Sequence, residues 1–230
     1  MLKARDFRYD AYQKLSGIWN TFALIALIYA LVVGALNVVP VAGSVAALVL
    51  GGPLTYGINA IALNVIRRKN IAIEQLFQGF YNFINTMLLY LLNTIFTALW
   101  SLLFIIPGIV AAYSYRMSYF IMYDNPSIAP DAARKASIEM MRGNKWRLFC
   151  LDFSFIGWYL LSVLTFGILS FWVLPYHYSA TAAFYQSLIA ERYSEPSGRN
   201  FNGDNSDNAY NGAQPSDPFD NSGINTDSTF

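Results

Sequence analysis

The sequence predicts an all-α, polytopic membrane protein with six transmembrane helices in three hairpins, and three observations support this prediction. Charged residues make up 13% of the chain, whereas a soluble domain usually contains about 25%. The apolar residues are gathered in blocks that could cross about 30 Å of hydrocarbon, which takes roughly 20 helical residues. The cations are confined to alternate connections between these blocks.

The apolar blocks set the predicted boundaries. Residues 1–17 form an amphipathic cytoplasmic segment, residues 18–193 a membrane domain, and residues 194–230 a disordered tail, because Asn, Asp, Ser and Gly dominate it. We expect the first apolar run to stay uncleaved, since its 19 residues exceed the h-region of a signal peptide. The six spans are expected at residues 18–36, 43–66, 83–106, 109–123, 148–166 and 170–190.

The N-terminal segment places Phe7, Ala11 and Leu15 four residues apart with cations around them. This spacing is typical of a short helix that lies at the membrane interface. A solvated tail is the alternative interpretation.

The distribution of cations predicts the orientation. Fourteen of the fifteen Lys and Arg residues lie before the first span, in the second and fourth connections, or after the last span. The turns near Val38, Pro107 and Gly167 contain none. Because cations are retained on the cytoplasmic side, we expect both termini to lie in the cytoplasm.

Each even-numbered span is predicted to begin at a proline near the outer side, namely Pro53, Pro107 and Pro175. From there to its charged inner end each span has 14 to 17 residues, which is short for a bilayer. Either the helix continues before the proline, as transmembrane helices tolerate, or the short helices mark an outer vestibule on a substrate path.

Arg116 is the one cation predicted inside a span, about 12 Å from its inner end. A charge at that depth costs about 3 kcal/mol or more, so it should face protein or water and have a partner. We expect an ion pair with Asp152 in the fifth span. This pair either locks two helices together or forms a site for an ion or a lipid headgroup.

His177 is the only histidine and is predicted near the outer side, where it could titrate near neutrality. A hydrogen-bonded packing role is the alternative. The candidate polar outer site consists of His177 and four tyrosines, Tyr113, Tyr115, Tyr176 and Tyr178. On the inner side, Lys145, Trp146 and Arg147 are predicted to anchor the fifth span at the headgroups.

Several kinds of chemistry lack their sequence signatures. The chain has no P-loop and no Gly-x-Ser-x-Gly turn, and one Cys with one His cannot build a closed zinc site. We therefore expect neither an enzyme nor a metal or other cofactor. A net charge of +1 argues against nucleic acid as a partner.

Three stretches carry a family resemblance: LWSLLFIIPGIVAAYSYRMSYFIMYDNP, MMRGNKWRLFCLDFSFIGWYLL and LPYHYSATAAFY. Over residues 99–188 the chain resembles the bacterial integral-membrane family known as domain of unknown function 975, with GGPLTYG and LFQGF as weaker upstream matches. The resemblance implies a multi-pass protein of the bacterial plasma membrane and brings no catalytic residues. A fainter likeness to the membrane domain of some glycerophosphodiester phosphodiesterases suggests lipid handling.

Two functions follow as hypotheses. In the first, the protein is an accessory or scaffolding protein that docks other membrane proteins through the amphipathic segments 71–84 and 130–142. In the alternative, it is a small transporter or a lipid-handling protein that uses the region around Arg116, Asp152 and His177. A transporter should have a polar cavity within its spans, whereas a scaffold should be tightly packed there. Besides the lipid bilayer, we expect other membrane proteins or lipids as partners.

Overall fold

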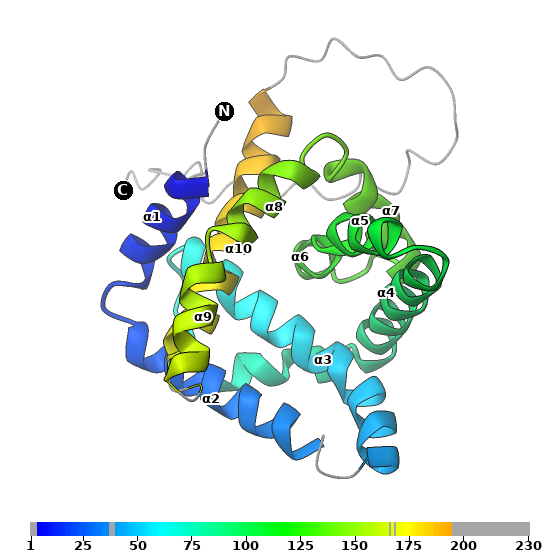
Figure 1. Cartoon of the computed structure of the whole chain (residues 1–230), viewed down its shortest axis with the longest axis horizontal. Helices are drawn as coiled ribbons and strands as arrows, with labels where there is room; N and C mark the ends of the chain where they lie inside the picture. Colours follow the sequence, from blue (N-terminus) through cyan, green and yellow to red (C-terminus); the bar gives the residue numbers. More distant parts are fainter. Residues whose placement is uncertain (1–3, 37–39, 166, 168, 195–230) are drawn as a thin grey trace, which may run out of the picture. The chain divides into compact units, whose positions relative to one another are not determined.

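A computed structural model describes residues 4–36, 40–165, 167 and 169–194, and every regular element in this part of the chain is helical (Figure 1). The predicted all-α class is therefore confirmed. In chain order the elements are α1 (Ala4–Leu15), α2 (Trp19–Leu36), α3 (Pro40–Ile66), the 3-10 helix η1 (Ile73–Phe80), α4 (Phe83–Leu103), α5 (Ile105–Tyr115), α6 (Ser118–Asp124), α7 (Pro130–Met140), α8 (Lys145–Phe153), α9 (Ile156–Leu164) and α10 (Ser170–Ser194).

Three stretches of the described residues are long and apolar enough to cross a membrane: Leu48–Ile66, Phe83–Leu103 and Lys145–Leu164. A fourth results if Arg5–Leu15 and Trp19–Val32, which meet at a bend of 103°, count as one broken span. The six predicted spans are thus only partly recovered. One reason is that the predicted fourth span is divided between α5 and α6, each too short to cross alone.

The prolines do not begin the second and sixth spans, which corrects the prediction for Pro53 and Pro175. Helix α3 begins at Pro40 and α10 at Ser170, and both continue through the proline. Only Pro107 lies in the first turn of its helix, α5. The interpretation in which the helices continue before the proline therefore holds for α3 and α10, and their lengths give no reason for a vestibule.

The amphipathic face of α1 packs onto the rest of the chain. Phe7, Ala11 and Leu15 are all buried. The Phe7 ring meets Phe184 of α10 edge-on, with the ring centroids 5.3 Å apart. The helical spacing was predicted correctly, but these residues face the neighbouring helices rather than a membrane interface.

Glycines bring η1 and the start of α4 into direct contact with the middle of α3. A Cβ atom on Gly57 would collide with the backbone of Leu76, and one on Gly79 would collide with the backbone of Pro53. A Cβ atom on Gly52 would likewise meet the backbone of Thr86. The segment 71–84 therefore lies along α3 in the structure.

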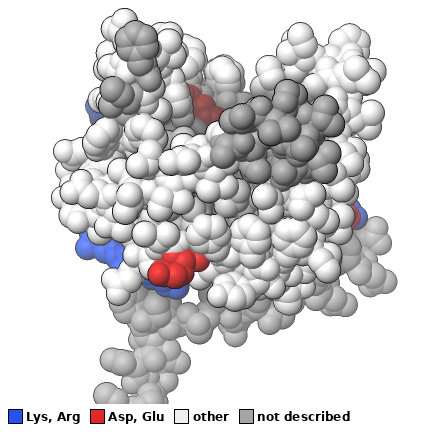
Figure 2. All heavy atoms as spheres, turned by 90° about the horizontal axis from the view of Figure 1, so that it is seen from below, with Lys and Arg blue, Asp and Glu red and all other residues white. Residues whose placement is uncertain are grey.

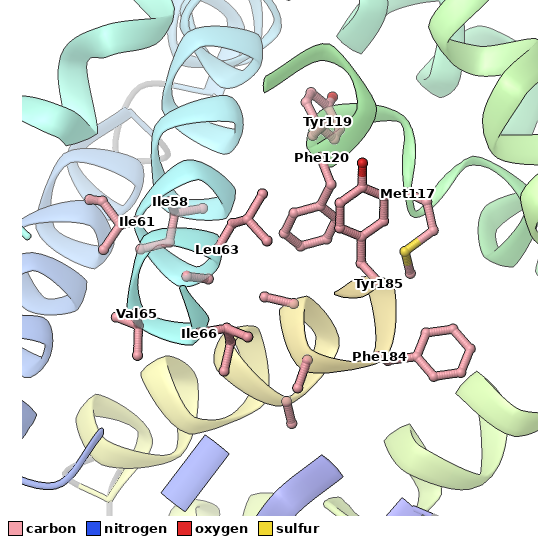
Figure 3. Packing of buried hydrophobic residues seen from close by; sticks show 14 of the residues in the cluster. Ile58, Ile61, Leu63, Val65, Ile66, Met117, Tyr119, Phe120, Phe184 and Tyr185 are labelled. Atoms are coloured by element: carbon pink, nitrogen blue, oxygen red, sulfur yellow. The ribbon is translucent and has the colours of Figure 1, made fainter. Parts of the chain in front are cut away.

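The central core is formed where α3, α6 and α10 meet (Figure 3). Phe120 of α6 and Tyr185 of α10 stack with their centroids 5.1 Å apart, next to the isoleucines of α3 (Figure 3). Asp124, at the end of α6, accepts two hydrogen bonds from Arg67, of 2.6 and 2.8 Å, and one from the Tyr185 hydroxyl, of 2.8 Å. The C-terminal ends of α3 and α6 are thereby joined to α10.

Helix α7 is more deeply packed than the prediction for 130–142 allows. Ala133, Ser137 and Met140 are buried, and so is Arg134. The guanidinium carbon of Arg134 lies 4.2 Å from the ring centroid of Phe96 in α4. The apolar face of α7 is therefore covered by the chain itself, through its packing against α4, α5 and α6.

The surface agrees with the apolar composition. The face in Figure 2 is almost free of charged side chains, which appear in a few small groups. Leu102, Ile105 and Val163 are among the most exposed apolar residues. Such helices are compatible with membrane insertion. The predicted disordered tail, 194–230, lies outside the described residues except for Ser194, which ends α10.

Candidate functional site: a polar cavity at Arg116

Polar side chains follow helical spacing along one face of α4. Asn93, Thr94, Thr97 and Ser101 recur at intervals of three and four residues, which places them on one side of the helix. The opposite side carries apolar residues such as Leu103, which is exposed. Because α4 is one of the candidate spans, its polar face should turn toward protein or water rather than lipid.

A cavity of about 480 Å³ lies along this polar face. Its lining comes from α3, α4, α5, α6, α10 and the α5–α6 junction, and it is rich in amide and hydroxyl groups. The lining residues are Thr55, Asn59, Tyr90, Asn93, Thr94, Thr97, Ala98, Ser101, Ala112, Tyr115, Arg116, Tyr119 and Tyr178.

Arg116 is the only charged side chain among these described lining residues. It lies between α5 and α6, where the regular helix is interrupted, and its side chain is exposed. Arg116 lines the cavity, and the expectation that it faces protein or water within the membrane stays a prediction. A free hydrogen-bond acceptor in the cavity can orient a ligand that carries a hydrogen-bond donor. Asn93 is one such group, since its Nδ2 donates to Ser118 Oγ at 2.9 Å and its Oδ1 has no partner among the described residues.

Ser137 of α7 fills the break beside Arg116. Its hydroxyl donates to the carbonyl oxygen of Ser114 at 2.7 Å and accepts from the backbone N–H of Met117 at 3.1 Å. Ser137 is fully buried, so an unmade bond here would be costly. This hydroxyl satisfies backbone groups on both sides of Arg116 and so holds the interruption in one geometry.

Asp152 pairs with His177, which corrects the predicted pairing with Arg116. His177 Nε2 lies 2.8 Å from Asp152 Oδ1, and the described residues include no Arg116–Asp152 ion pair within 4.0 Å. Arg116 is still close enough to act on the Asp152 carboxylate electrostatically. The partner differs because His177 of α10 faces α8 and lies nearer to the Asp152 carboxylate than Arg116 does.

The predicted polar tyrosines divide into two groups. Tyr115 and Tyr178 line the cavity with Arg116. Tyr113 instead packs edge-on against Phe149, with centroids 6.1 Å apart, and the Tyr176 hydroxyl donates to the carbonyl of Arg8 at 3.2 Å. Two of the four tyrosines therefore line the cavity with Arg116, and Tyr113 lies outside the lining but close enough to interact electrostatically with Arg116 and Asp152.

The predicted interface anchor is also divided. Trp146 is exposed, as an anchor in the headgroup region must be, whereas Arg147 is mostly buried. The Arg147 guanidinium donates two hydrogen bonds of 2.8 Å to the carboxylate of Glu191. Anchoring by Lys145, Trp146 and Arg147 stays a prediction, and Arg147 is ion-paired with Glu191 of α10.

The sequence did not predict most of the residues that line the cavity. Asn59 and Asn93 attract attention in the sequence only as general hydrogen-bonding groups between helices. The stronger signal is the repeat from Tyr90 to Ser101, where polar side chains return every three or four residues in an otherwise apolar span. Thr55 and Asn59 repeat it four residues apart in α3.

Fold and cavity together define a class of protein: one that is helical throughout its described residues, with membrane-compatible helices and an open cavity whose described lining includes one cation. Within that class, the family model described as protein of unknown function (DUF975) matches residues 1–115 and 102–192. The chain belongs to this family, which confirms the resemblance found in residues 99–188. No curated protein and no solved structure matches the chain.

Proposed function

We propose that this chain is a non-enzymatic membrane protein that binds an anionic ligand at Arg116, as a small carrier or a lipid-handling protein. The observation that carries the proposal is the open cavity at Arg116, whose described lining holds one guanidinium among amide, hydroxyl and aromatic groups and no carboxylate. Its volume of about 480 Å³ is typical of small-ligand sites. A guanidinium binds phosphate or carboxylate oxygens through parallel hydrogen bonds, so these groups are the chemistry the cavity favours. The ligand is either a small anion or the headgroup of an anionic lipid.

The proposed setting is the bacterial plasma membrane, with six spans and both termini in the cytoplasm. In this arrangement α5 with α6, and α8 with α9, are broken spans. The contact of Arg67 with Asp124 supports it, because it brings the predicted inner ends of α3 and α6 together. The contact of Arg147 with Glu191 does the same for α8 and α10.

The scaffold hypothesis has less support. It needs amphipathic faces that are free to dock a partner, but the apolar face of α7 packs within the chain. In the segment 71–84, Leu76 and Gly79 are buried against α3. The exposed large apolar residues of this segment are Ile73, Phe77, Phe80, Tyr81 and Ile84. These five residues offer a docking surface on one segment, whereas the cavity draws its lining from five helices and contains a cation.

The test is ligand binding by purified protein in detergent. Sulfate and inorganic phosphate serve as small anions, and thermal unfolding measures binding because a ligand at 100 times its Kd stabilises the folded state by about 2.7 kcal/mol. Native mass spectrometry detects a co-purified anionic lipid. Stabilisation by the small anions indicates a solute carrier, and a retained lipid indicates lipid handling.

Two variants make the test specific to the cavity. Arg116→Gln should lose the stabilisation or the bound lipid, because the amide keeps the length of the side chain in part and removes its charge. Arg142→Gln is the matched control, since this arginine is exposed on the surface and pairs with Glu139 at 2.8 Å. The proposal is wrong if Arg116→Gln binds as the unmodified protein does, or if neither ligand binds.

A further inference from the structure

A sheltered histidine–carboxylate pair lies beside the cavity without forming part of its lining. Asp152 Oδ1 of α8 and His177 Nε2 of α10 are 2.8 Å apart, and His177 is 9% exposed. The rings of Phe155 and Tyr159 pack edge-on against the imidazole, with centroid distances of 5.0 and 5.9 Å. Since a charge is costly in such surroundings, the protonation state of this pair is tied to the charges next to it.

Two residues connect the pair to the cavity. The Tyr178 ring lines the cavity and meets the His177 ring edge-on, with the centroids 6.4 Å apart. Arg116 belongs to the same lining as Tyr178, so one side chain separates His177 from the cavity. A change of charge on the pair therefore takes place next to the site where the anion is proposed to bind.

Histidine is the side-chain type that ordinarily changes its charge between pH 5 and 8, whereas a phenol stays neutral and an arginine stays charged there. The titratable and charged groups around the pair are Tyr113 of α5, Arg116, Tyr159 of α9, and Tyr176 and Tyr178 of α10. Further out, Arg8 of α1 donates to the carbonyl of Ser154 at 3.3 Å, and Tyr29 of α2 interacts with Tyr178.

The hydrogen bond also assigns the position of the proton. An ionised carboxylate only accepts, so a neutral His177 must donate its Nε2–H to Asp152 and keep the lone pair on Nδ1. A proton taken from water then adds to Nδ1, and the pair changes from a net charge of −1 to neutral.

We propose that the Asp152–His177 pair binds one proton together with the anion at Arg116. This inference rests on the proposed function. While His177 is neutral, the Asp152 carboxylate offsets the positive charge of Arg116 and weakens anion binding. When His177 is protonated, it neutralises Asp152 and leaves the charge of Arg116 available to the anion. Because coupling between two binding events is reciprocal, the bound anion also favours the protonated histidine.

The experiment uses sulfate, whose charge does not change between pH 5.5 and 8.5. Sulfate is added to the full-length protein in weakly buffered detergent, and the uptake of protons is measured for each sulfate bound. Because the chain has one histidine, NMR of histidine-labelled protein reports the protonation of His177 without any substitution. We expect up to one proton per sulfate and a histidine signal that moves toward the imidazolium form.

The matched variant is His177→Gln, whose amide can donate to Asp152 but cannot be protonated. The affinity of the unmodified protein should fall by up to about tenfold per pH unit where His177 loses its proton, while the affinity of His177→Gln stays constant. Sulfate binding that depends on Arg116 without proton uptake overturns this inference alone. The absence of binding dependent on Arg116 overturns the proposed function as well.

Discussion

The hydroxyl of Ser137 accepts a hydrogen bond of 3.1 Å from the backbone N–H of Met117, and this contact joins α7 to the break in which Arg116 lies. The same hydroxyl donates to Ser114 on the other side of the break. Arg116 is therefore positioned by a residue twenty-one positions further along the chain, in a segment that sequence analysis assigned to the cytoplasm.

Substitution Ser137→Ala should therefore weaken anion binding as well as stability. It leaves the buried N–H of Met117 without its partner, which costs about 1–3 kcal/mol. Thermal unfolding in detergent measures the loss of stability, and the sulfate affinity measures the loss of anion binding. The control is Ser127→Ala, because Ser127 is exposed and bonds only locally to Asn125. A Ser137→Ala protein that is destabilised but keeps its full sulfate affinity would show that Ser137 has no positioning role.

The glycine contacts between α3 and η1 predict a second set of variants. Gly57→Ala and Gly79→Ala each place a Cβ atom against backbone that cannot move aside, so each should cost about 1–3 kcal/mol or more. Gly157→Ala is the control, since no atom lies within 4 Å of its added Cβ. Thermal unfolding in detergent should give lower midpoints for Gly57→Ala and Gly79→Ala than for Gly157→Ala. Equal midpoints for all of them would contradict the close approach of η1 to α3.

The Arg147–Glu191 pair predicts a pH dependence of stability. Hydrogen bonds from Arg147 lower the pKa of Glu191 below its usual range. The unfolded chain then binds more protons, so the contribution is present above the usual glutamate pKa and is lost as the pH falls through the lower, folded-state pKa. Because the Glu191 side chain is 42% exposed, the contribution of the pair to stability amounts to about 1 kcal/mol at most. Unfolding midpoints at pH 7 and pH 3.5 should therefore differ less in Glu191→Gln than in the unmodified protein, and equal differences would refute the prediction.

Much of the fold could be predicted because apolar blocks have a strong physical signature. The block at 43–66 corresponds to most of α3, and the turn near Pro107 falls close to the end of α4 at Leu103. The interruption at Arg116 could not be predicted, because its backbone groups are satisfied by Ser137 from a distant segment. Likewise, hydrophobic spacing marks one face of α7 without indicating whether a partner or the chain itself covers it.

The sequence predicted which charged residues belong to the candidate site better than it predicted which of them are in contact. Charge and residue type single out Arg116, Asp152 and His177, since each is rare within an apolar span. Their pairing depends on which faces of α8 and α10 meet, and the positions of the spans in the sequence do not indicate that. The cavity is lined by polar residues such as Asn93 and Thr97 that share one face of α4. Their helical spacing is hidden in the sequence because the apolar residues of the span dominate its pattern.

The proposed orientation can be tested by labelling single cysteines in cells. In a Cys150→Ser background, Lys69→Cys lies just beyond the C-terminal end of α3, and Leu103→Cys ends α4 with its side chain 62% exposed. If α4 crosses the membrane outward, a membrane-impermeant maleimide labels Leu103→Cys in intact cells and Lys69→Cys only after the cells are opened. A permeant maleimide controls for reactivity, since it must label both. Labelling of both sites from outside would place the Arg67–Asp124 contact and the turn at Pro107 on the same side, and α4 could then not be a span.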